Sequence, residues 1–274
     1  MERRGCVAGL FSDSFMSKFA SGKLASIVGL VGLLLLAGCA TPPPADDPDA
    51  VAEFQQINDP LEPMNRSIFS FNEWIYDNGL TPAANAYRYV VPKWGRDRVA
   101  DVLANLKSPV VLINDLAQGN FTRGGVTLLR FLLNSTFGVG GIMDVATPMG
   151  LPAHVADVGE TFAVWGADEG FYLVLPVFGP SNPRDALGLG IESTLDPLSY
   201  YLADNKMRWV STTRFLISGL SQYEGYMDSL AEVKRTSLDY YSAMRSLYRQ
   251  RREAQIKDAE SGEWAPQGSL NNKH

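Results

Sequence analysis

The chain has 274 residues, a formal net charge of −6 and 46% hydrophobic residues. An acidic chain argues against a nucleic-acid partner and against anionic headgroups as an electrostatic target. Two cysteines and two histidines are too few for a clustered metal site, so we expect no metal and no cofactor.

The first segment, residues 1–38, is predicted to be a bacterial lipoprotein signal peptide. Lys18 and Lys23 precede an apolar run from Leu24 to Ala37. A charged start, an apolar middle of about 7–15 residues and small residues at the cut are typical of a secretory signal. Because the run ends in Leu36-Ala37-Gly38-Cys39, we expect the thiol of Cys39 to be acylated and to become the mature N-terminus. The alternatives are an ordinary signal peptide and a short membrane anchor, but the run is shorter than the about 20 residues of a comfortable span.

Translation is expected to start at Met16, which gives a signal of ordinary length. Cleavage before Cys39 changes the net charge from −6 to −8, because the removed segment holds four basic and two acidic residues. Ala40 follows the lipidated cysteine, and the absence of aspartate there favours the inner face of the outer membrane. The next residues, 39–57, are rich in proline and aspartate and are predicted to form an extended tether of about 3 Å per residue.

The body, residues 58–257, is predicted to be one almost wholly helical domain. Asp59-Pro60-Leu61-Glu62 has the pattern of a capped start, but Pro63 disturbs it. The first helix is therefore predicted to begin at Pro63 and to stop at Asn78-Gly79. Other starts are predicted where a proline follows a capping residue, because proline at the first helical position lacks only an N–H that would have no partner. These pairs are Thr81-Pro82, Ser108-Pro109, Asn182-Pro183 and Asp196-Pro197.

The remaining elements follow from periodicity and capping. Helices are predicted over 92–107, 110–118, 122–134 and 157–165, the last capped by Asp157. Phe171 to Leu175 is too short to separate a strand from a buried extended segment. After Asn205, residues that favour helix dominate, which predicts helix there. An approximate apolar stripe runs along it, made of Leu230, Val233, Leu238, Tyr241, Met244 and Tyr248. The polar tail, residues 258–274, is predicted to be disordered.

One segment departs from the pattern of a soluble helical protein. From Phe131 to Ala156 the only formal charge is Asp144, and glycines and prolines interrupt the segment too often for one spanning helix. Two short apolar arms around Gly138-Val139-Gly140-Gly141 would form a hairpin that enters a bilayer partway. Its turn would then have to be covered by protein or to line a wet cavity. The alternative is a buried hairpin in the core of an ordinary helical domain, and the two interpretations stay open at this point.

The motifs of hydrolases are absent from the sequence. Gly179-Pro180-Ser181-Asn182-Pro183 lacks the last glycine of a nucleophile elbow. A Ser-His-Asp site would have to use His154, because the other histidine, His274, ends the tail. The glycine cluster at 138–141 has no following Lys-Ser/Thr, so it indicates a turn and not a phosphate loop. We therefore expect no catalytic residue and no enzyme activity.

Several segments, in order along the chain, carry a family pattern. They are Asn58-Asp59-Pro60-Leu61-Glu62, Asn65-Arg66, Phe69-Ser70-Phe71-Asn72, Asn105-Leu106, Asn114-Asp115, Gln118-Gly119, Arg130-Phe131-Leu132-Leu133-Asn134-Ser135-Thr136, Gly138-Val139-Gly140-Gly141, Asp144-Val145-Ala146, Gly159-Glu160-Thr161, Trp165-Gly166, Leu175-Pro176-Val177-Phe178-Gly179-Pro180-Ser181 and Arg184-Asp185. In these segments the chain resembles the MlaA (VacJ) family of outer-membrane phospholipid-transport lipoproteins, from about Asn58 to Tyr201.

The resemblance implies an all-α, ring-like helical lipoprotein, embedded in the outer membrane from the periplasmic side, with a polar channel. It also implies association with trimeric porins, removal of phospholipids that have strayed into the outer leaflet, and their transfer to a periplasmic phospholipid-carrier protein. Lipid asymmetry of the outer membrane is maintained in this way. Two alternatives are a structural envelope lipoprotein that bridges to a porin or to peptidoglycan, and an envelope lipid hydrolase.

Under this resemblance the glycine-rich hairpin is our candidate for the wall and gate of the lipid path, because a headgroup crosses hydrocarbon at a cost of several kcal/mol unless a polar path is provided. The polar groups would come from Asn134, Ser135, Thr136 and Asp144. The apolar groups that face lipid would be Phe137, Val139, Ile142 and Met143. Gly138, Gly140 and Gly141 would let the hairpin hinge.

Overall fold

The computed structural model describes residues 59–262, so Cys39, the signal peptide and the tether lie outside the described residues. The chain divides into two compact units at Met64 and Asn65, inside the range predicted as one domain. Within the first unit, the carbonyl of Asp59 accepts a hydrogen bond from the Glu62 N–H, and the helix begins there. The elements described below, after that start, belong to the second unit.

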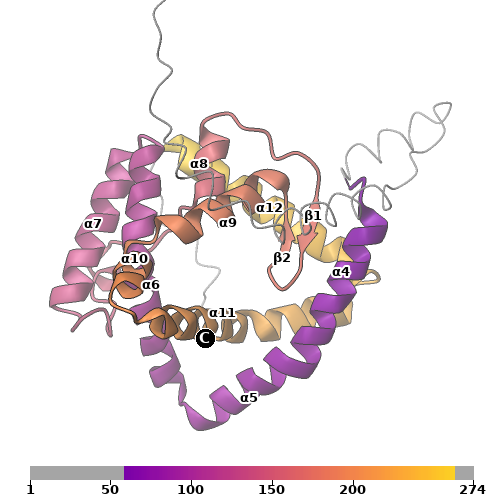
Figure 1. Cartoon of the computed structure of the whole chain (residues 1–274), viewed down its shortest axis with the longest axis horizontal. Coiled ribbons are helices and arrows are strands. Elements are labelled where there is room, and N and C mark those ends of the chain that lie inside the picture. Colours follow the sequence, from indigo (N-terminus) through magenta and orange to yellow (C-terminus); the bar gives the residue numbers. More distant parts are fainter. Residues whose placement is uncertain (1–58, 263–274) are drawn as a thin grey trace, which may run out of the picture. The chain divides into compact units, whose positions relative to one another are not determined.

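The described residues are mostly helical, as predicted (Figure 1). The helices in chain order are α4 (Glu62–Ile75), α5 (Thr81–Val90), α6 (Lys93–Ala117), α7 (Phe121–Thr136), α8 (Val158–Val164), α9 (Pro183–Leu195), α10 (Pro197–Asp204), α11 (Arg208–Thr236) and α12 (Tyr240–Ser261). A π-helical segment, Tyr76–Leu80, joins α4 to α5, and a 3₁₀ turn spans Thr147–Met149. The ring-like form and the polar channel stay predictions.

Two short strands form one antiparallel hairpin, β1 (Leu173–Leu175) with β2 (Gly179–Ser181). The strand alternative for Phe171 to Leu175 is therefore the right one. Side chains of α4 hold the free edge of β1: the Asn65 amide donates to the Tyr172 carbonyl at 3.1 Å and accepts from the Val174 N–H at 2.9 Å. Asn72 lies two turns later on α4. Its amide donates to the Leu175 carbonyl and accepts from the Val177 N–H. These buried asparagines replace the neighbouring strand that an edge would otherwise need.

The apolar core beside this hairpin is small. Tyr172 and Val174 of the hairpin meet Tyr241 of α12, and Ile68 and Phe69 of α4 pack against them. Elsewhere α6 packs along α7, α8 lies against α9 and α12, and α11 contacts both α5 and α6. Figure 1 shows α6 and α7 side by side at one end of this second unit.

The predicted helix caps at Asp157, Asn182 and Asp196 are confirmed. The side chain of each accepts a hydrogen bond from a backbone N–H in the first turn of α8, α9 or α10. Asn120 caps α7 in the same way, so the helix predicted over 122–134 begins at Phe121 and runs to Thr136.

Two predicted helix ends are wrong. The helix does not stop at Asn78-Gly79, because the chain continues through the π-helical segment into α5, with the Thr81 N–H bonded to the Tyr76 carbonyl. Thr81 is consequently the first residue of α5 and not its cap, and Pro82 lies in the first turn. Ser108-Pro109 is likewise no start, since Pro109 lies inside the single helix α6. Proline removes one helical hydrogen bond there, and packing of both halves of α6 against α7 outweighs that cost.

The C-terminal predictions also need correction. The stripe from Leu230 to Tyr248 is divided between α11 and α12, and Leu238 lies fully exposed between them. The last helix continues past residue 257 to Ser261, where Gly262 ends it in the left-handed conformation. Asp258 explains the extra turn, because its carboxylate lies 3.5 Å from the buried Arg123 guanidinium. The rest of the predicted tail, 263–274, lies outside the described residues.

Candidate functional site

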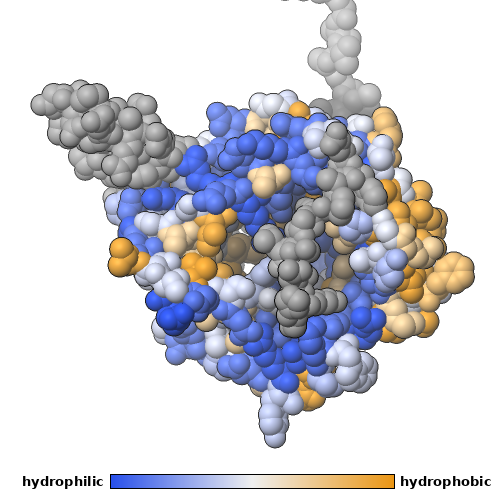
Figure 2. Space-filling view, turned by 180° about the vertical axis from the view of Figure 1, so that it is seen from behind, coloured by the Kyte–Doolittle hydropathy of each residue, from blue (hydrophilic) through white to orange (hydrophobic). Residues whose placement is uncertain are grey.

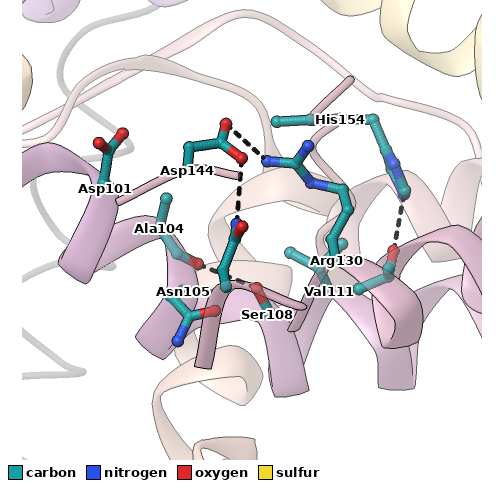
Figure 3. A pocket seen from close by; sticks show the side chains of 11 residues that line it. Asp101, Ala104, Asn105, Ser108, Val111, Arg130, Asp144 and His154 are labelled. Atoms are coloured by element: carbon teal, nitrogen blue, oxygen red, sulfur yellow. Dashed lines mark hydrogen bonds and ion pairs between the residues drawn. The ribbon is translucent and has the colours of Figure 1, made fainter. Parts of the chain in front are cut away.

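A polar cavity of about 70 Å³ lies between α6, α7 and the segment that follows α7 (Figure 3). Helix α6 contributes polar groups one to two turns apart, at Asp101, Asn105 and Ser108, and α7 contributes Arg130 across from them. In Figure 3, Asp101 and Asp144 lie toward one end of the lining and His154 toward the other, with Arg130 between them. The full lining is Asp101, Ala104, Asn105, Ser108, Val111, Thr127, Arg130, Asn134, Asp144, Ala153 and His154.

Asn134 fixes the path of the chain after α7. Its Oδ1 accepts hydrogen bonds from the Val145 N–H at 2.9 Å and the Ala146 N–H at 3.1 Å, and its Nδ2 donates to the Asp144 carboxylate at 3.1 Å. Asn134 is buried, so these bonds form away from water, where an unmade bond costs about 1–3 kcal/mol. One amide at the end of a helix thereby holds the start of the segment 144–147.

Asp144 is the charged centre of this arrangement. Its carboxylate pairs with the Arg130 guanidinium at 3.1 Å and accepts from both the N–H and the hydroxyl of Thr147. Burial raises the pKa of Asp144, but the hydrogen bonds from Thr147 and the charge of Arg130 outweigh that effect and hold the pKa below its usual value. Arg130 also donates to the Leu151 carbonyl. This one side chain of α7 therefore binds the following segment at both Asp144 and Leu151.

The first arm of the predicted hairpin is the end of α7, and the chain that follows the turn is not helical. α7 ends at Thr136, and residues 137–143 turn back through backbone hydrogen bonds, such as Gly141 N–H to the Asn134 carbonyl at 2.8 Å. The glycines adopt the left-handed conformation at 140 and 141, which does not continue as a second helix. The loop then packs on α6 through Gly141, where a Cβ atom would lie 2.6 Å from the Asn105 side chain, and the Asn105 amide also donates to the Ser135 hydroxyl of α7 at 3.0 Å.

The structure places the predicted site residues in three environments. Asn134 and Asp144 line the cavity, whereas Ser135 bonds to Asn105 and Thr136 bonds back to the Leu132 carbonyl of its own helix. Gly138 and Gly141 are buried, and Gly140 is exposed. The apolar residues of the turn, Phe137, Val139, Ile142 and Met143, are all exposed.

The α6 residues that line the cavity were not predicted as site residues from the sequence. Asp101, Asn105 and Ser108 follow the i, i+4, i+7 spacing of one helix face. A polar line of this kind within an otherwise amphipathic helix is a detectable signal. The sequence indicated Arg130 only as part of a family pattern. Its ion pair with Asp144 forms because the turn at 137–143 brings the chain back alongside α7.

His154 lines the cavity and belongs to a buried hydrogen-bonded group with Asp115 and Thr127. Its Nε2 lies 2.9 Å from one oxygen of the fully buried Asp115 carboxylate and 3.0 Å from the other. The Thr127 hydroxyl donates to the same carboxylate at 2.6 Å and approaches the same Nε2 at 3.3 Å. A nucleophile–base–acid relay needs the hydroxyl and the acid on opposite ring nitrogens, so His154 does not form one here.

The described residues hold no group of three or more His, Cys, Asp or Glu side chains arranged for a metal ion. In the same part of the chain, no helix is both long enough and apolar enough to cross a bilayer. The side chains that line the cavity include the Arg130–Asp144 ion pair and several hydrogen-bonding groups.

Comparison with known proteins assigns the family. Residues 57–255 match the family described as MlaA lipoprotein. The chain is 30% identical to the intermembrane phospholipid transport system lipoprotein MlaA of Escherichia coli strain K12 over 246 residues, which is 88% of this chain and 91% of the relative. It is 31% identical over 212 residues to an uncharacterized Rickettsia prowazekii protein, covering 75% and 81% of the two chains.

A solved structure is also similar. It is described as the structural basis for maintenance of bacterial outer membrane lipid asymmetry, with 32% identity and a TM-score of 0.63. The match covers 72% of this chain and 98% of that one. The chain therefore belongs to the MlaA lipoprotein family, whose members are lipoproteins of the bacterial envelope.

Proposed function

We propose that this protein is the outer-membrane lipoprotein of an intermembrane phospholipid transport system. It removes mislocalised phospholipids from the outer leaflet and passes them to a periplasmic carrier, and so maintains lipid asymmetry. The observation that carries the proposal is family membership over residues 57–255, together with relatives named as lipoproteins of such a system. No catalytic step is needed, because moving a lipid between membranes breaks no bond.

The distribution of polar and apolar side chains supports a place in a membrane. Among the described residues, more of the buried side chains are polar or charged than apolar, while many large apolar side chains are exposed. A water-soluble protein has the opposite preference, and large exposed apolar patches mark interaction or membrane surfaces. Figure 2 shows such a patch, in orange, over the α6–α7 end of the second unit. The exposed large apolar residues of this part of α6, of α7 and of the turn after α7 are Ile113, Leu116, Phe121, Leu128, Leu129, Leu132, Phe137, Val139, Ile142 and Met143.

The lipidated Cys39 and this apolar patch would together hold the protein at the inner face of the outer membrane. The porin and the periplasmic carrier are partners that we propose by extension from the family resemblance. The polar side chains of the cavity between α6 and α7 would offer hydrogen bonds to part of a headgroup that leaves hydrocarbon.

The segment 134–144 is proposed as the wall and gate of the lipid path. It joins the cavity, through Asn134 and Asp144, to the exposed apolar turn at 137–143. A disulfide that ties the two arms of the segment together tests this role, with one cysteine in α7 and the other in residues 142–147, at positions that leave the contacts of Asn134, Gly141 and Asp144 intact. The oxidised double variant is expected to remain in the membrane but to stop lipid removal, and reduction should restore it. Normal transport in the oxidised form would exclude gating by this segment.

The function itself is tested by the phospholipid content of the outer leaflet, measured by an outer-leaflet acylation assay in cells with and without this protein. Deletion should cause phospholipid to accumulate there. The wild-type gene should reverse the accumulation, and the Cys39→Ala variant should not. An unchanged outer leaflet, in cells that lack a second copy, would favour a structural lipoprotein or a hydrolase instead.

A further inference from the structure

The turn of the β1–β2 hairpin is connected to helix α11 at two places. Phe178 in the turn contacts Phe215 of α11, with ring centroids 6.2 Å apart. Tyr76 of the π-helical segment donates from its hydroxyl to the Val177 carbonyl at 3.1 Å and stacks on Tyr223 of α11, with ring centroids 5.6 Å apart. The two contacts on α11 are therefore about two helical turns apart.

Gly219 lies on α11 between these two contacts, with open space beside it. Phe215, Gly219 and Tyr223 are spaced i, i+4 and i+8, so they share one face of the helix. No heavy atom lies within 4 Å of the place that a Cβ atom would take on Gly219. Phe178 and Phe215 are 54% and 56% exposed, so their contact leaves apolar surface of both rings free. An open space on α11 is thus bordered by aromatic side chains.

Val177 holds an unfavourable backbone conformation at this place. Its φ of +71° lies in the left-handed region, which glycine adopts freely and a β-branched residue rarely adopts. Asn72 accepts from the Val177 N–H at 2.7 Å and Tyr76 donates to its carbonyl, so the surrounding structure enforces the conformation. Strain of this kind gathers at positions that contact ligands. The valine side chain is 51% exposed, and an apolar ligand would remove that surface from water.

The chemistry of these residues selects a hydrocarbon ligand. We call Val177, Phe178, Phe215, Gly219 and Tyr223 the Gly219 site, and none of the five side chains carries a formal charge. Apolar side chains bind hydrocarbon in proportion to the area that both remove from water. The missing Cβ at Gly219 leaves room for a methylene chain to approach the helix backbone closely.

We propose that the Gly219 site binds an acyl chain of the phospholipid that the protein transports. The inference rests on the proposed function, because it names the part of the cargo that this surface contacts. None of the five residues belongs to the apolar patch of α6, α7 and the turn after α7, so the site is separate from the surface proposed to face the membrane.

The first test is photocrosslinking of the full-length lipoprotein in cells, with Phe178 replaced by p-benzoylphenylalanine. Illumination precedes extraction, so the alkyl chains of a detergent do not compete. Mass spectrometry of the purified protein should show a phospholipid adduct. An adduct with another protein, or no phospholipid adduct, would overturn the inference.

The second test fills the space beside Gly219. Gly219→Leu, combined with the photoreactive residue, should lower the yield of phospholipid adduct about 10-fold, the effect of displacing about two CH₂ groups from apolar contact. Gly225→Leu is the matched control. Gly225 also has open space around it, and it lies six residues later, on another face of α11. Both substitutions raise helix propensity equally, so α11 is expected to stay folded in both, and the control should keep the yield.

The yield is expressed per lipoprotein in the membrane fraction, and phospholipid that copurifies without illumination is measured in the same samples. An equal yield in Gly219→Leu and the control would assign the adduct to bulk bilayer lipid and overturn the inference. An equal loss in both variants would assign it to a general change in α11 and overturn it as well. Failure of the proposed function is seen separately, as an outer leaflet that does not change on deletion.

Discussion

Gly141 packs directly against Asn105. A Cβ atom built on Gly141 would lie 2.6 Å from both the Cβ and the Nδ2 of Asn105, which is closer than real side chains approach. The backbone of Gly141 has a φ of +89°, and its N–H donates to the Asn134 carbonyl at 2.8 Å. This one residue therefore fastens the turn after α7 to both α7 and α6.

We predict that Gly141→Ala displaces the turn from α6 and lowers the free energy of unfolding by about 2–3 kcal/mol, because the clash adds to the strain of a positive φ. Gly140→Ala is the matched control. Gly140 has a φ of +71°, but no heavy atom lies within 4 Å of the place that a Cβ atom would take there, so its cost is the strain alone, about 1 kcal/mol. Denaturant unfolding in detergent measures both variants. Equal losses would show that contact with Asn105 adds nothing.

A second prediction concerns the amide that orders the loop. Asn134→Ala removes three hydrogen bonds to buried or half-buried groups and leaves the Val145 and Ala146 N–H groups without their acceptor. The free energy of unfolding should fall by about 2–3 kcal/mol, and segment 144–147 should become sensitive to proteolysis. Thr136→Ala, which loses only a bond to its own helix at an exposed site, should change the free energy by less than about 0.5 kcal/mol. A loop that stays protected in Asn134→Ala would contradict this role.

Local chemistry decided which elements could be predicted from the sequence. The caps at Asp157, Asn182 and Asp196 depend on a side chain and an N–H two or three residues away, so the pattern alone revealed them. The helix stop expected at Gly79 and the helix start expected at Pro109 are wrong, because contacts from distant elements stabilise a continuous helix at both places. Tyr76 in the π-helical segment, for example, stacks on Tyr223 of α11 and donates to the Val177 carbonyl.

The cavity residues also differ in whether local sequence predicted them. Asn134 and Asp144 were predicted together, since they flank one turn and bond across it. Asp101 and Asn105 were missed, because they lie on a helix about 30 residues earlier and reach the cavity only through the packing of α6 on α7. Spacing along one helix can suggest a polar face, but it does not say which helix covers that face.

A third prediction concerns the contact between α8 and α9. A Cβ atom on Gly188 would lie 2.5 Å from the backbone N of Gly159, so the two helices touch through glycine. Gly188→Ala should therefore separate them and lower the free energy of unfolding by about 2–3 kcal/mol. Gly190→Ala, two residues later on α9 and with open space around it, should raise stability by up to about 1 kcal/mol through helix propensity. Thermal unfolding of the two variants checks the difference, and a stable Gly188→Ala would exclude close packing.

The last prediction concerns pH. Glu160 is fully buried on α8, and burial, followed by the charge of Asp157, raises its pKa from 4.5 to about 8. Between these two values the folded protein holds a proton on Glu160 that the unfolded chain releases. The free energy of unfolding therefore falls as pH rises through this window, and the contribution of Glu160 is greatest below pH 4.5. Glu160→Gln should remove this dependence and make the protein more stable than wild type above about pH 8, by on the order of a few kcal/mol.

Denaturant unfolding from about pH 5 to about pH 9 measures the slope. Glu232→Gln serves as the control, because Glu232 is 59% exposed and pairs only with its neighbour Arg235 on α11. That variant should follow the wild-type slope over the whole range. The Gln118 amide, which donates to the Glu160 Oε1 at 3.3 Å, can still donate to the amide oxygen of a glutamine, so the substitution preserves the packing while removing the proton. A wild-type slope retained in Glu160→Gln would assign the pH dependence to another group.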